Sequence, residues 1–234
     1  MSERVEAAAP ASAAAVAADA ERALDAMQAG GVAILPLDVA YAIVGTTAAA
    51  IRTIFAVKNR SYDKPSGMFA TWETSRELHV MPAEHHAIAR VIVEEYGLPF
   101  SIVAPYRGDH PLCRKIDPFV LQSSTKNGTM DMLINAGPWH DAVARLATAR
   151  EIAVFGSSAN RSLTGSKYRL ADIEPEVREA AAVAIDGGRS KYANAEGTSS
   201  TIIDFRDFHF VRRGVMWERL RDIFQDRFGI ALRN

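Results

Sequence analysis

Short apolar runs without polar alternation constrain most strongly how this chain can fold. The runs at 32–35, 132–134 and 152–155 are apolar at every position, and a single serine interrupts the run at 100–104. Strands with this pattern are buried on both faces, as in sheets covered by helices, whereas a half-exposed strand alternates apolar with polar residues. The runs therefore predict a buried sheet.

Amphipathic segments separate these runs and are expected to form helices. One helix is expected to begin near Ser12 and to end at Gly30–Gly31, a second follows the capping residue Thr47, and a third starts at Pro82. The other expected elements are helices at 139–149 and 172–182, strands at 68–69, 183–185, 201–204 and 208–211, and a last helix that contains Leu220, Ile223, Phe224 and Phe228. Strands that alternate with helices predict an α/β fold with a mixed, twisted sheet. Residues 106–128 have the weakest periodicity and are expected to form a long irregular excursion.

The chain is expected to form one domain at 19–234, preceded by an Ala-rich N-terminal extension at 1–18. A length of 234 residues suits one large domain or two small ones, and no internal repeat or Gly/Ser-rich linker divides the sequence. The single cysteine, Cys113, excludes an internal disulfide framework and a zinc site built on several thiolates. The formal charge of −1 provides no overall attraction to nucleic acid, so any anion site must come from a local cluster of charges.

A cytoplasmic location without membrane association is expected. No stretch reaches the roughly 18 apolar residues that a transmembrane helix needs. The Ala-rich run from Ala7 to Ala18 follows a segment with two glutamates and one arginine, whereas a secretory signal peptide begins with a positive region.

Several common active-site motifs are missing from the sequence. The chain has no GxxxxGK[ST] phosphate loop, no GxGxxG after a strand and no GxSxG nucleophile elbow. His85 and His86 are adjacent on a predicted helix and face different directions, which favours a surface role over a metal site. An unrelated α/β hydrolase or reductase is therefore disfavoured, and neither a metal site in the protein nor a covalent nucleophile is expected.

Basic residues gather in predicted loops and at strand ends. Lys58, Arg60 and Lys64 lie in the loop after the second helix, the segment 156–171 carries three basic residues and no acid, and Arg212–Arg213 end the last strand. Serine, threonine and asparagine residues accompany them. Cations combined with polar turns suit a polyphosphate ligand. A polyphosphate site is the favoured interpretation, and the alternative is that these surface loops are basic by chance.

The order of several short motifs resembles the YrdC family, which includes threonylcarbamoyl-AMP synthase. The resemblance covers roughly Gly31 to Met216. In chain order, the motifs that carry it are Pro36-Leu37-Asp38-Val39-Ala40-Tyr41 after a strand, Lys58-Asn59-Arg60 after a helix, Lys64-Pro65, Ser158-Ala159-Asn160-Arg161-Ser162, Ser200-Thr201 and Arg212-Arg213-Gly214. Each motif alone is weak, and their common order is specific.

The resemblance implies an open twisted mixed sheet with flanking helices and a large basic cavity. It also implies a reaction in which ATP, bicarbonate and L-threonine give threonylcarbamoyl-AMP and pyrophosphate, with Mg²⁺, on the way to the threonylcarbamoyl group of tRNA. Carried over by position, the nucleotide-binding residues would be Lys58, Arg60, Lys64, Ser158, Asn160, Ser200 and Arg212. The pocket for the second substrate would be formed by Leu37, Val39, Tyr41 and Ser101. No residue is expected to act as a covalent catalyst.

The sequence also departs from the family where the second substrate is expected. Two threonines and two glycines of the family segment P-T-D-T-V-Y-G-L-G are replaced by Leu37, Val39, Ala42 and Val44. Leucine and valine cannot donate or accept the hydrogen bonds that threonine hydroxyls make. Ser101 only partly replaces a family threonine, and Asn135 lies nearest to the position of a family arginine. The fold should survive these changes, and the protein is expected to bind ATP or AMP better than it performs the standard threonine reaction.

Two functions therefore remain open. One is an enzyme of the threonylcarbamoyl-AMP synthase type that acts on ATP and an amino acid in a tRNA modification pathway, with RNA or tRNA-modification proteins as partners. The other is a binding module that holds ATP, AMP or double-stranded RNA without catalysis, because A-form RNA is recognised largely through its phosphates and shape. The lysine and arginine residues favour a nucleotide in either case.

Overall fold

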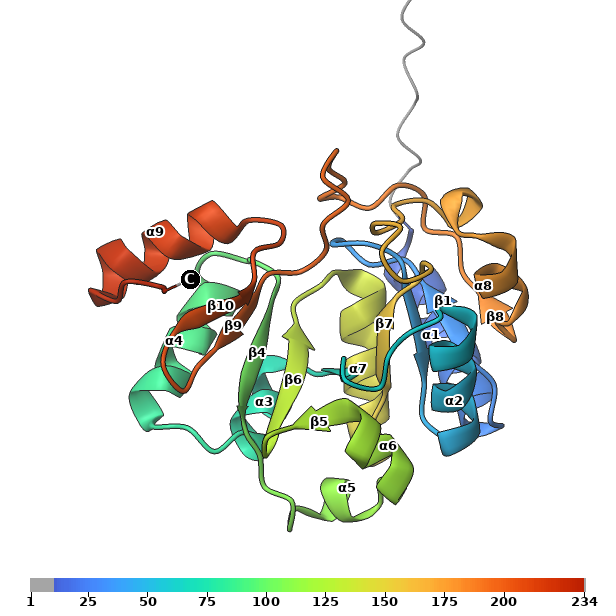
Figure 1. The fold of residues 1–234 in the computed structure, drawn as a ribbon, viewed down its shortest axis with the longest axis horizontal. Coiled ribbons are helices and arrows are strands. Elements are labelled where there is room, and N and C mark those ends of the chain that lie inside the picture. Colours follow the sequence, from blue (N-terminus) through green and yellow to red (C-terminus); the bar gives the residue numbers. More distant parts are fainter. Residues whose placement is uncertain (1–10, 234) are drawn as a thin grey trace, which may run out of the picture.

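One mixed sheet of ten strands runs through residues 11–233, the part of the chain that this computed structural model describes (Figure 1). The strands are β1 (Ala33–Leu35), β2 (Ala42–Gly45), β3 (Gly67–Phe69), β4 (Phe100–Pro105), β5 (Thr125–Lys126), β6 (Thr129–Ile134), β7 (Phe155–Ser158), β8 (Val183–Ala184), β9 (Ile202–Asp204) and β10 (His209–Arg212). Their order is β10-β9-β4-β6-β3-β7-β2-β1-β8, and β5 pairs with β6 outside this path. The pairs β1–β8, β3–β6 and β4–β9 are parallel and the others are antiparallel, which confirms the predicted mixed, open sheet.

Helices cover the sheet in three groups, each with its own apolar cluster. They are α1 (Ala13–Gln28), α2 (Ala48–Val57), α3 (Trp72–Leu78), α4 (Ala83–Glu94), α5 (Pro111–Arg114), α6 (Pro118–Ser124), α7 (Pro138–Ala149), α8 (Pro175–Glu179) and α9 (Trp217–Phe228), with a 3₁₀ turn at Leu170–Asp172. The first group is α1 with α7, the second is α2 with α5, α6 and α8, and the third is α4 with α9 beside the β9–β10 hairpin at the left of Figure 1. Helix α3 contributes Leu78 to the second cluster and Trp72 to the third. Within 11–233, no helix has both the length and the apolar character that crossing a bilayer demands.

Local capping explains where the first two helices start. The side chains of Ser12 and Thr47 accept hydrogen bonds from the backbone N–H groups of Ala15 and Ala50, at 3.2 Å each. Both starts were predictable from the sequence. Helix α1 crosses the boundary predicted at residue 18 and already buries Val16, while residues 1–10 of the predicted extension lie outside the described residues.

Several predicted elements are wrong in extent. Residues 106–128 contain α5, α6 and β5 instead of an irregular excursion, because the pairs His110–Pro111 and Asp117–Pro118 start helices too short to show periodicity. The predicted helix at 172–182 contracts to α8. The strand predicted at 152–155 is observed instead at β7. Its glycine and serine residues lack the apolar pattern by which a buried strand is predicted. Strand β2 and helix α3 were not predicted.

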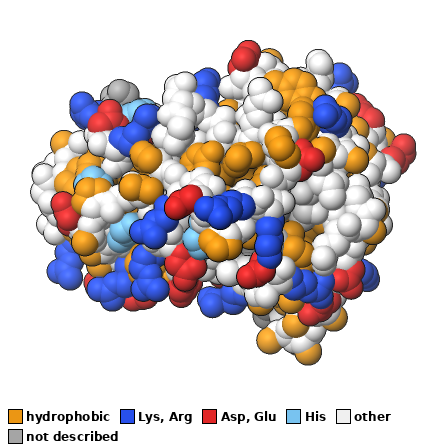
Figure 2. Space-filling view, turned by 90° about the horizontal axis from the view of Figure 1, so that it is seen from below, with side chains coloured by type: hydrophobic (Ala, Val, Ile, Leu, Met, Phe, Trp, Pro, Cys, Tyr) orange, Lys and Arg blue, Asp and Glu red, His pale blue; other side chains and the backbone are white. Residues whose placement is uncertain are grey.

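Acidic and basic side chains are interspersed over the surface seen from below in Figure 2. Patches of lysine and arginine there are separated by aspartate and glutamate and by apolar side chains. This face therefore offers no continuous surface of one charge.

Candidate functional site

A hollow lies on one face of the middle strands, where the register brings small side chains together. Asp131 of β6 pairs with Val103 of β4, and Ser101 of β4 pairs with Ile202 of β9, so these side chains project from the same face. Gly67 of β3 lies directly beside Asp131: a Cβ atom on this glycine would stand 3.3 Å from Asp131 Oδ2. Because glycine and serine fill little space, a cavity of about 150 Å³ remains above this face.

This inner cavity adjoins a wider depression of about 770 Å³, and the two share part of their walls. The shared residues are Arg60, Pro65, Asp131, Ile202 and Arg212. Among the side chains that line the two spaces, five are cationic and three are acidic. The cavity walls are thus net positive even though the whole chain is not.

Two arginines from separate parts of the chain stand at the junction of these spaces. Arg60, after α2, donates to the backbone oxygens of Lys64 (3.0 Å) and Pro65 (2.8 Å). Arg212, at the end of β10, donates through Nε and Nη2 to Ser200 O (3.0 and 2.8 Å) and through Nη2 to Ser200 Oγ (3.0 Å). These contacts hold both guanidinium groups in place. Among the described residues, Nη1 of each has no hydrogen-bond partner, so donors remain available for a ligand.

Asp131 faces the same junction and is the acidic residue of the inner cavity. Its Oδ1 atom is buried and has no hydrogen-bond partner among the residues that the structure describes. No ion pair within 4.0 Å joins it to a cation of residues 11–233, although Arg60 and Arg212 line the same cavity. Burial raises the pKa of Asp131 to about 6, and the charge of Arg212, the hydroxyl of Ser101 and the charge of Arg60 oppose this rise.

Lys58 lies behind the cavity wall instead of lining it. Its side chain is buried, and Nζ donates to the backbone oxygens of Ser158 and Asn160, at 2.5 Å each. Burial, followed by the positive charge of Arg60, lowers the pKa of Lys58 to about 7, while Glu174 opposes the shift. Lys58 therefore fastens the segment that follows β7.

Apolar side chains form another wall of the inner cavity. Leu37 and Val39 lie between β1 and β2, are buried, and line the cavity together with Tyr41. The Tyr41 hydroxyl donates to Gly188 O (2.8 Å) and lies 3.0 Å from Asp186 Oδ1, which anchors the loop after β8. Burial and this carboxylate raise the pKa of Tyr41, so its hydroxyl stays protonated.

The structure brings together most of the site residues that the sequence predicts. Of the predicted nucleotide-binding residues, the inner cavity is lined by Arg60, Ser158, Ser200 and Arg212, and the outer depression by Lys64. Lys58 and Asn160 are buried behind them and line neither space. The four residues predicted for the second substrate, Leu37, Val39, Tyr41 and Ser101, all line the inner cavity.

Sequence reasoning missed two residues of β6 that line the inner cavity, Asp131 and Leu133. The available signal was a single acid between the apolar residues Met130 and Met132. Asn135, the predicted neighbour of the missing family arginine, instead donates from Nδ2 to Leu98 O at 3.2 Å, outside both spaces.

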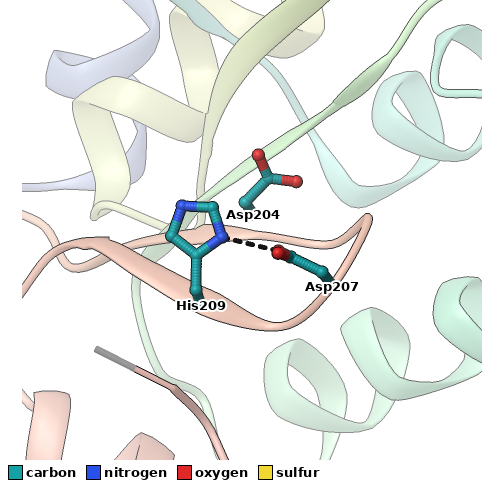
Figure 3. Close-up of side chains that lie close together, drawn as sticks. All are labelled: Asp204, Asp207 and His209. Atoms are coloured by element: carbon teal, nitrogen blue, oxygen red, sulfur yellow. Dashed lines mark hydrogen bonds and ion pairs between the residues drawn. The ribbon is translucent and has the colours of Figure 1, made fainter.

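A second polar cluster lies on the β9–β10 hairpin (Figure 3). Asp204, Asp207 and His209 offer metal-ligand atoms within 4.8 Å of one another, and His209 Nδ1 lies 2.5 Å from Asp207 Oδ1. However, both carboxylate oxygens of Asp204 already accept hydrogen bonds from Arg206. We assign this cluster to stabilisation of the turn, because its most buried carboxylate is neutralised within the protein.

Gly214 allows two segments of the site to approach each other closely. A Cβ atom there would lie 2.1 Å from Ser199 O and 2.4 Å from Ser200 O. Gly214→Ala is therefore expected to displace the segment that orients Arg212 and to lower the free energy of unfolding by about 1–3 kcal/mol, the usual cost of overpacking. Thermal unfolding would measure this loss.

Gly108→Ala is the matched control, because the nearest atom to a Cβ at that position, in the side chain of Tyr106, is 3.9 Å away. Equal stability of the two variants would show that the close approach at Gly214 does not constrain the site.

Comparisons with known proteins agree with this architecture. The family model of the Sua5, YciO and YrdC proteins, which is described as telomere recombination, matches residues 25–214. No curated protein matches the sequence. Among solved structures, a hypothetical protein of Streptococcus mutans UA159 is similar, with a TM-score of 0.74 and 16% identity over 90% of this chain and 92% of that chain.

Two further solved structures carry family names. Escherichia coli YciO has a TM-score of 0.63 and 16% identity over 87% of this chain and 91% of that chain. The Sua5 protein of P. abyssi, solved in complex with L-threonine, has a TM-score of 0.62 and 20% identity over 87% of this chain and 55% of that chain. This chain therefore spans about half the length of Sua5, and at these identities the similarity shows the fold alone.

Proposed function

Because the chain belongs to the Sua5/YciO/YrdC family, we propose that the inner cavity and the depression beside it bind the phosphates of an adenine nucleotide, ATP or AMP. The observation that carries the proposal is the pair of arginines at the junction of the two spaces. Backbone oxygens hold Arg60 and Arg212 in position, and both keep unpaired N–H groups among the described residues. Guanidinium groups that are oriented in advance bind phosphate oxygens well, because the cost of ordering them has already been met.

We propose further that the protein is a divergent enzyme of the threonylcarbamoyl-AMP synthase type. ATP, bicarbonate and an amino compound would give a carbamoyl-type adenylate and pyrophosphate, as one step of a tRNA modification pathway. Arg60 and Arg212 would stabilise the negative charge that develops on the leaving pyrophosphate. This reaction needs no covalent nucleophile from the protein, and RNA or tRNA-modification proteins would be its partners.

Magnesium would enter this site as the counter-ion of ATP. Mg²⁺ is usually held by one or two carboxylates together with substrate phosphates and several waters. Asp131 is the carboxylate that lines the inner cavity, and the positive charges of two arginines face it. These residues suit a magnesium ion that arrives bound to the phosphates of ATP. They suit less well an ion that protein ligands alone would hold.

Arg60→Ala should weaken the binding of ATP and AMP about tenfold or more, because one charge-assisted contact contributes about 1.5–3 kcal/mol. Calorimetry with each nucleotide would measure this change. Arg90→Ala, which removes an exposed arginine of α4 that pairs with Glu94, is the matched control and should leave nucleotide affinity unchanged. Wild-type protein that fails to bind either nucleotide would refute the proposal.

The same measurements distinguish the proposed enzyme from the alternative function, a module that binds nucleotide or double-stranded RNA without catalysis. Nucleotide binding without pyrophosphate release, across a panel of amino compounds, would favour the module. Double-stranded RNA would need a long positive surface, and acidic and basic side chains are interspersed on the face in Figure 2.

A further inference from the structure

The loop at 59–66 carries Arg60, and the side-chain hydrogen bonds of this arginine end on the same loop. Arg60 Nε donates to Lys64 O (3.0 Å), and Nη2 donates to Pro65 O (2.8 Å). These bonds fix the guanidinium group relative to the loop, but they do not fix the loop relative to the sheet. The position of the guanidinium group therefore depends on what fastens the middle of the loop to the core.

The ring of Tyr62 provides that connection. It stacks on the ring of Phe55 in α2, with 4.4 Å between the ring centroids and 11° between the ring planes. It also meets the ring of Phe119 in α6 edge to face, at 5.8 Å and 76°. Phe55 is buried in an apolar cluster against which Phe119 packs. The guanidinium group of Arg60 lies over the same Phe55 ring, with Cζ 5.8 Å from the centroid, so Tyr62 and Arg60 share one support.

The remaining restraints on the middle of the loop are weaker. The hydrogen bonds that side chains make with Ser61 and Asp63 are exposed to water, including the bond from Lys126 Nζ to Asp63 O at 3.2 Å. Exposed hydrogen bonds exchange readily for bonds with water and restrain a loop little. The two ring contacts of Tyr62 are therefore the main attachment of this segment to the core.

Tyr62 lies on the side of the loop that faces away from the proposed ligand. Its side chain is 54% exposed, and it lines a separate depression of about 400 Å³ between the loop, α2 and α6. It lines neither the inner cavity nor the outer depression, whereas the adjacent Asp63 lines both the outer depression and the separate one. The loop is thus the wall between them, and a change at Tyr62 reaches the ligand site only through this wall.

We propose that Tyr62 is a positioning residue, which holds Arg60 in its orientation toward the junction of the inner cavity and the outer depression. The inference rests on the proposed function and deepens it, because it identifies what supports one of the two phosphate-binding arginines. A guanidinium group that is already oriented costs less to order when a phosphate arrives. A loop released from Phe55 would lose this advantage while keeping every side chain that contacts the ligand.

Calorimetry with ATP and with inorganic pyrophosphate tests the link to the ligand site. Tyr62→Ala should weaken the binding of both by about threefold to tenfold, the range expected for the loss of the ring contacts. Tyr62→Phe keeps both ring contacts and should bind like the wild type. Tyr96→Ala is the matched control, because it removes an aromatic ring that lies 5.6 Å from the guanidinium carbon of Arg219, outside both ligand spaces.

A double-mutant cycle separates positioning from a general loss of structure. In the Arg60→Ala protein, the further substitution Tyr62→Ala should weaken ATP binding by less than about twofold, because the group that Tyr62 positions is absent.

Hydrogen exchange of the ligand-free protein measures the loop directly. Backbone hydrogen bonds protect the N–H groups of Arg60 and Lys64. Exchange in the segment 59–66 should become about threefold faster or more in Tyr62→Ala and stay unchanged in Tyr62→Phe, because local opening is easier once the rings no longer stack.

Several outcomes would overturn the proposal. These are unchanged ATP affinity in a Tyr62→Ala protein with a lowered melting temperature, an equal loss of affinity in Tyr62→Phe, and an undiminished effect of Tyr62→Ala in the Arg60→Ala background. Wild-type protein that binds neither ATP, AMP nor pyrophosphate would refute the proposed function. Hydrogen exchange would then decide the inference alone, since faster exchange in Tyr62→Ala supports the role of Tyr62 and unchanged exchange overturns it.

Discussion

The double substitution Leu37→Thr and Val39→Thr is expected to strengthen the binding of L-threonine by about 30-fold to more than 10⁴-fold. In the unaltered protein, both side chains are buried and line the inner cavity, so polar groups of L-threonine would meet apolar atoms at both positions. A buried polar group left without a partner costs about 1–3 kcal/mol, and two independent losses combine to roughly 2–6 kcal/mol. Calorimetry with L-threonine, and pyrophosphate release in the presence of ATP and bicarbonate, would measure the gain.

The corresponding control is Val80→Thr, which makes the same kind of change at an exposed position outside the cavity. It should leave threonine affinity unchanged. The unaltered protein should bind ATP or AMP better than it forms threonylcarbamoyl-AMP. Robust formation of that product by the unaltered protein would contradict the roles assigned to Leu37 and Val39.

Lys58→Met is expected to lower the free energy of unfolding by about 2–4 kcal/mol and the melting temperature by roughly 5–15 °C. Methionine fills similar space but donates no hydrogen bonds, so the backbone oxygens of Ser158 and Asn160 lose their donor. The substitution also removes the cost of burying an ammonium group, which keeps the loss below the sum for two unpaired carbonyls. Denaturant unfolding at pH 7 would measure the change.

The Lys58→Met penalty should grow as the pH rises from 7 to 10. The pKa of Lys58 is lowered to about 7 in the folded protein from its usual 10.5, so the unfolded chain binds more protons in this interval. Wild-type stability therefore gains from this group as the pH rises, and the methionine variant lacks that gain. Lys64→Met, at an exposed lysine of the same loop, is the control. A penalty that stays constant with pH would contradict the buried, shifted amine.

Much of the sheet could be predicted because its strands are apolar on both faces. The runs that became β1, β4 and β6 were apparent from composition alone, and Ser12 and Thr47 indicated the helix starts through their capping oxygens. Where the sheet is hollow, this signal fails. Strand β7 passes from phenylalanine to glycine and serine because its later residues line the inner cavity.

The site could be predicted in part for a similar reason. Cationic residues in loops are a visible signal, and Arg60 and Arg212 do meet at the cavity. Whether a lysine faces a ligand or a backbone oxygen depends on side-chain direction, which sequence position alone does not provide. Lys58 and Arg60 are two residues apart and point to different environments. Asp131 escaped notice because its importance arises from neighbours on β3, β4 and β10 that are distant in the sequence.

Lys58 lies behind the wall, so the residue that stabilises the wall is not one that contacts the ligand. Many active sites combine these two tasks in the same residues. The groups that keep the wall in shape are buried away from the ligand space, while Leu37 and Val39 touch that space. Substitutions at these two positions that keep a similar side-chain volume should therefore return folded proteins with different ligand preferences, whereas variation at Lys58 should return few. In evolutionary terms, a scaffold built in this way can exchange one small substrate for another through a handful of substitutions while its architecture persists.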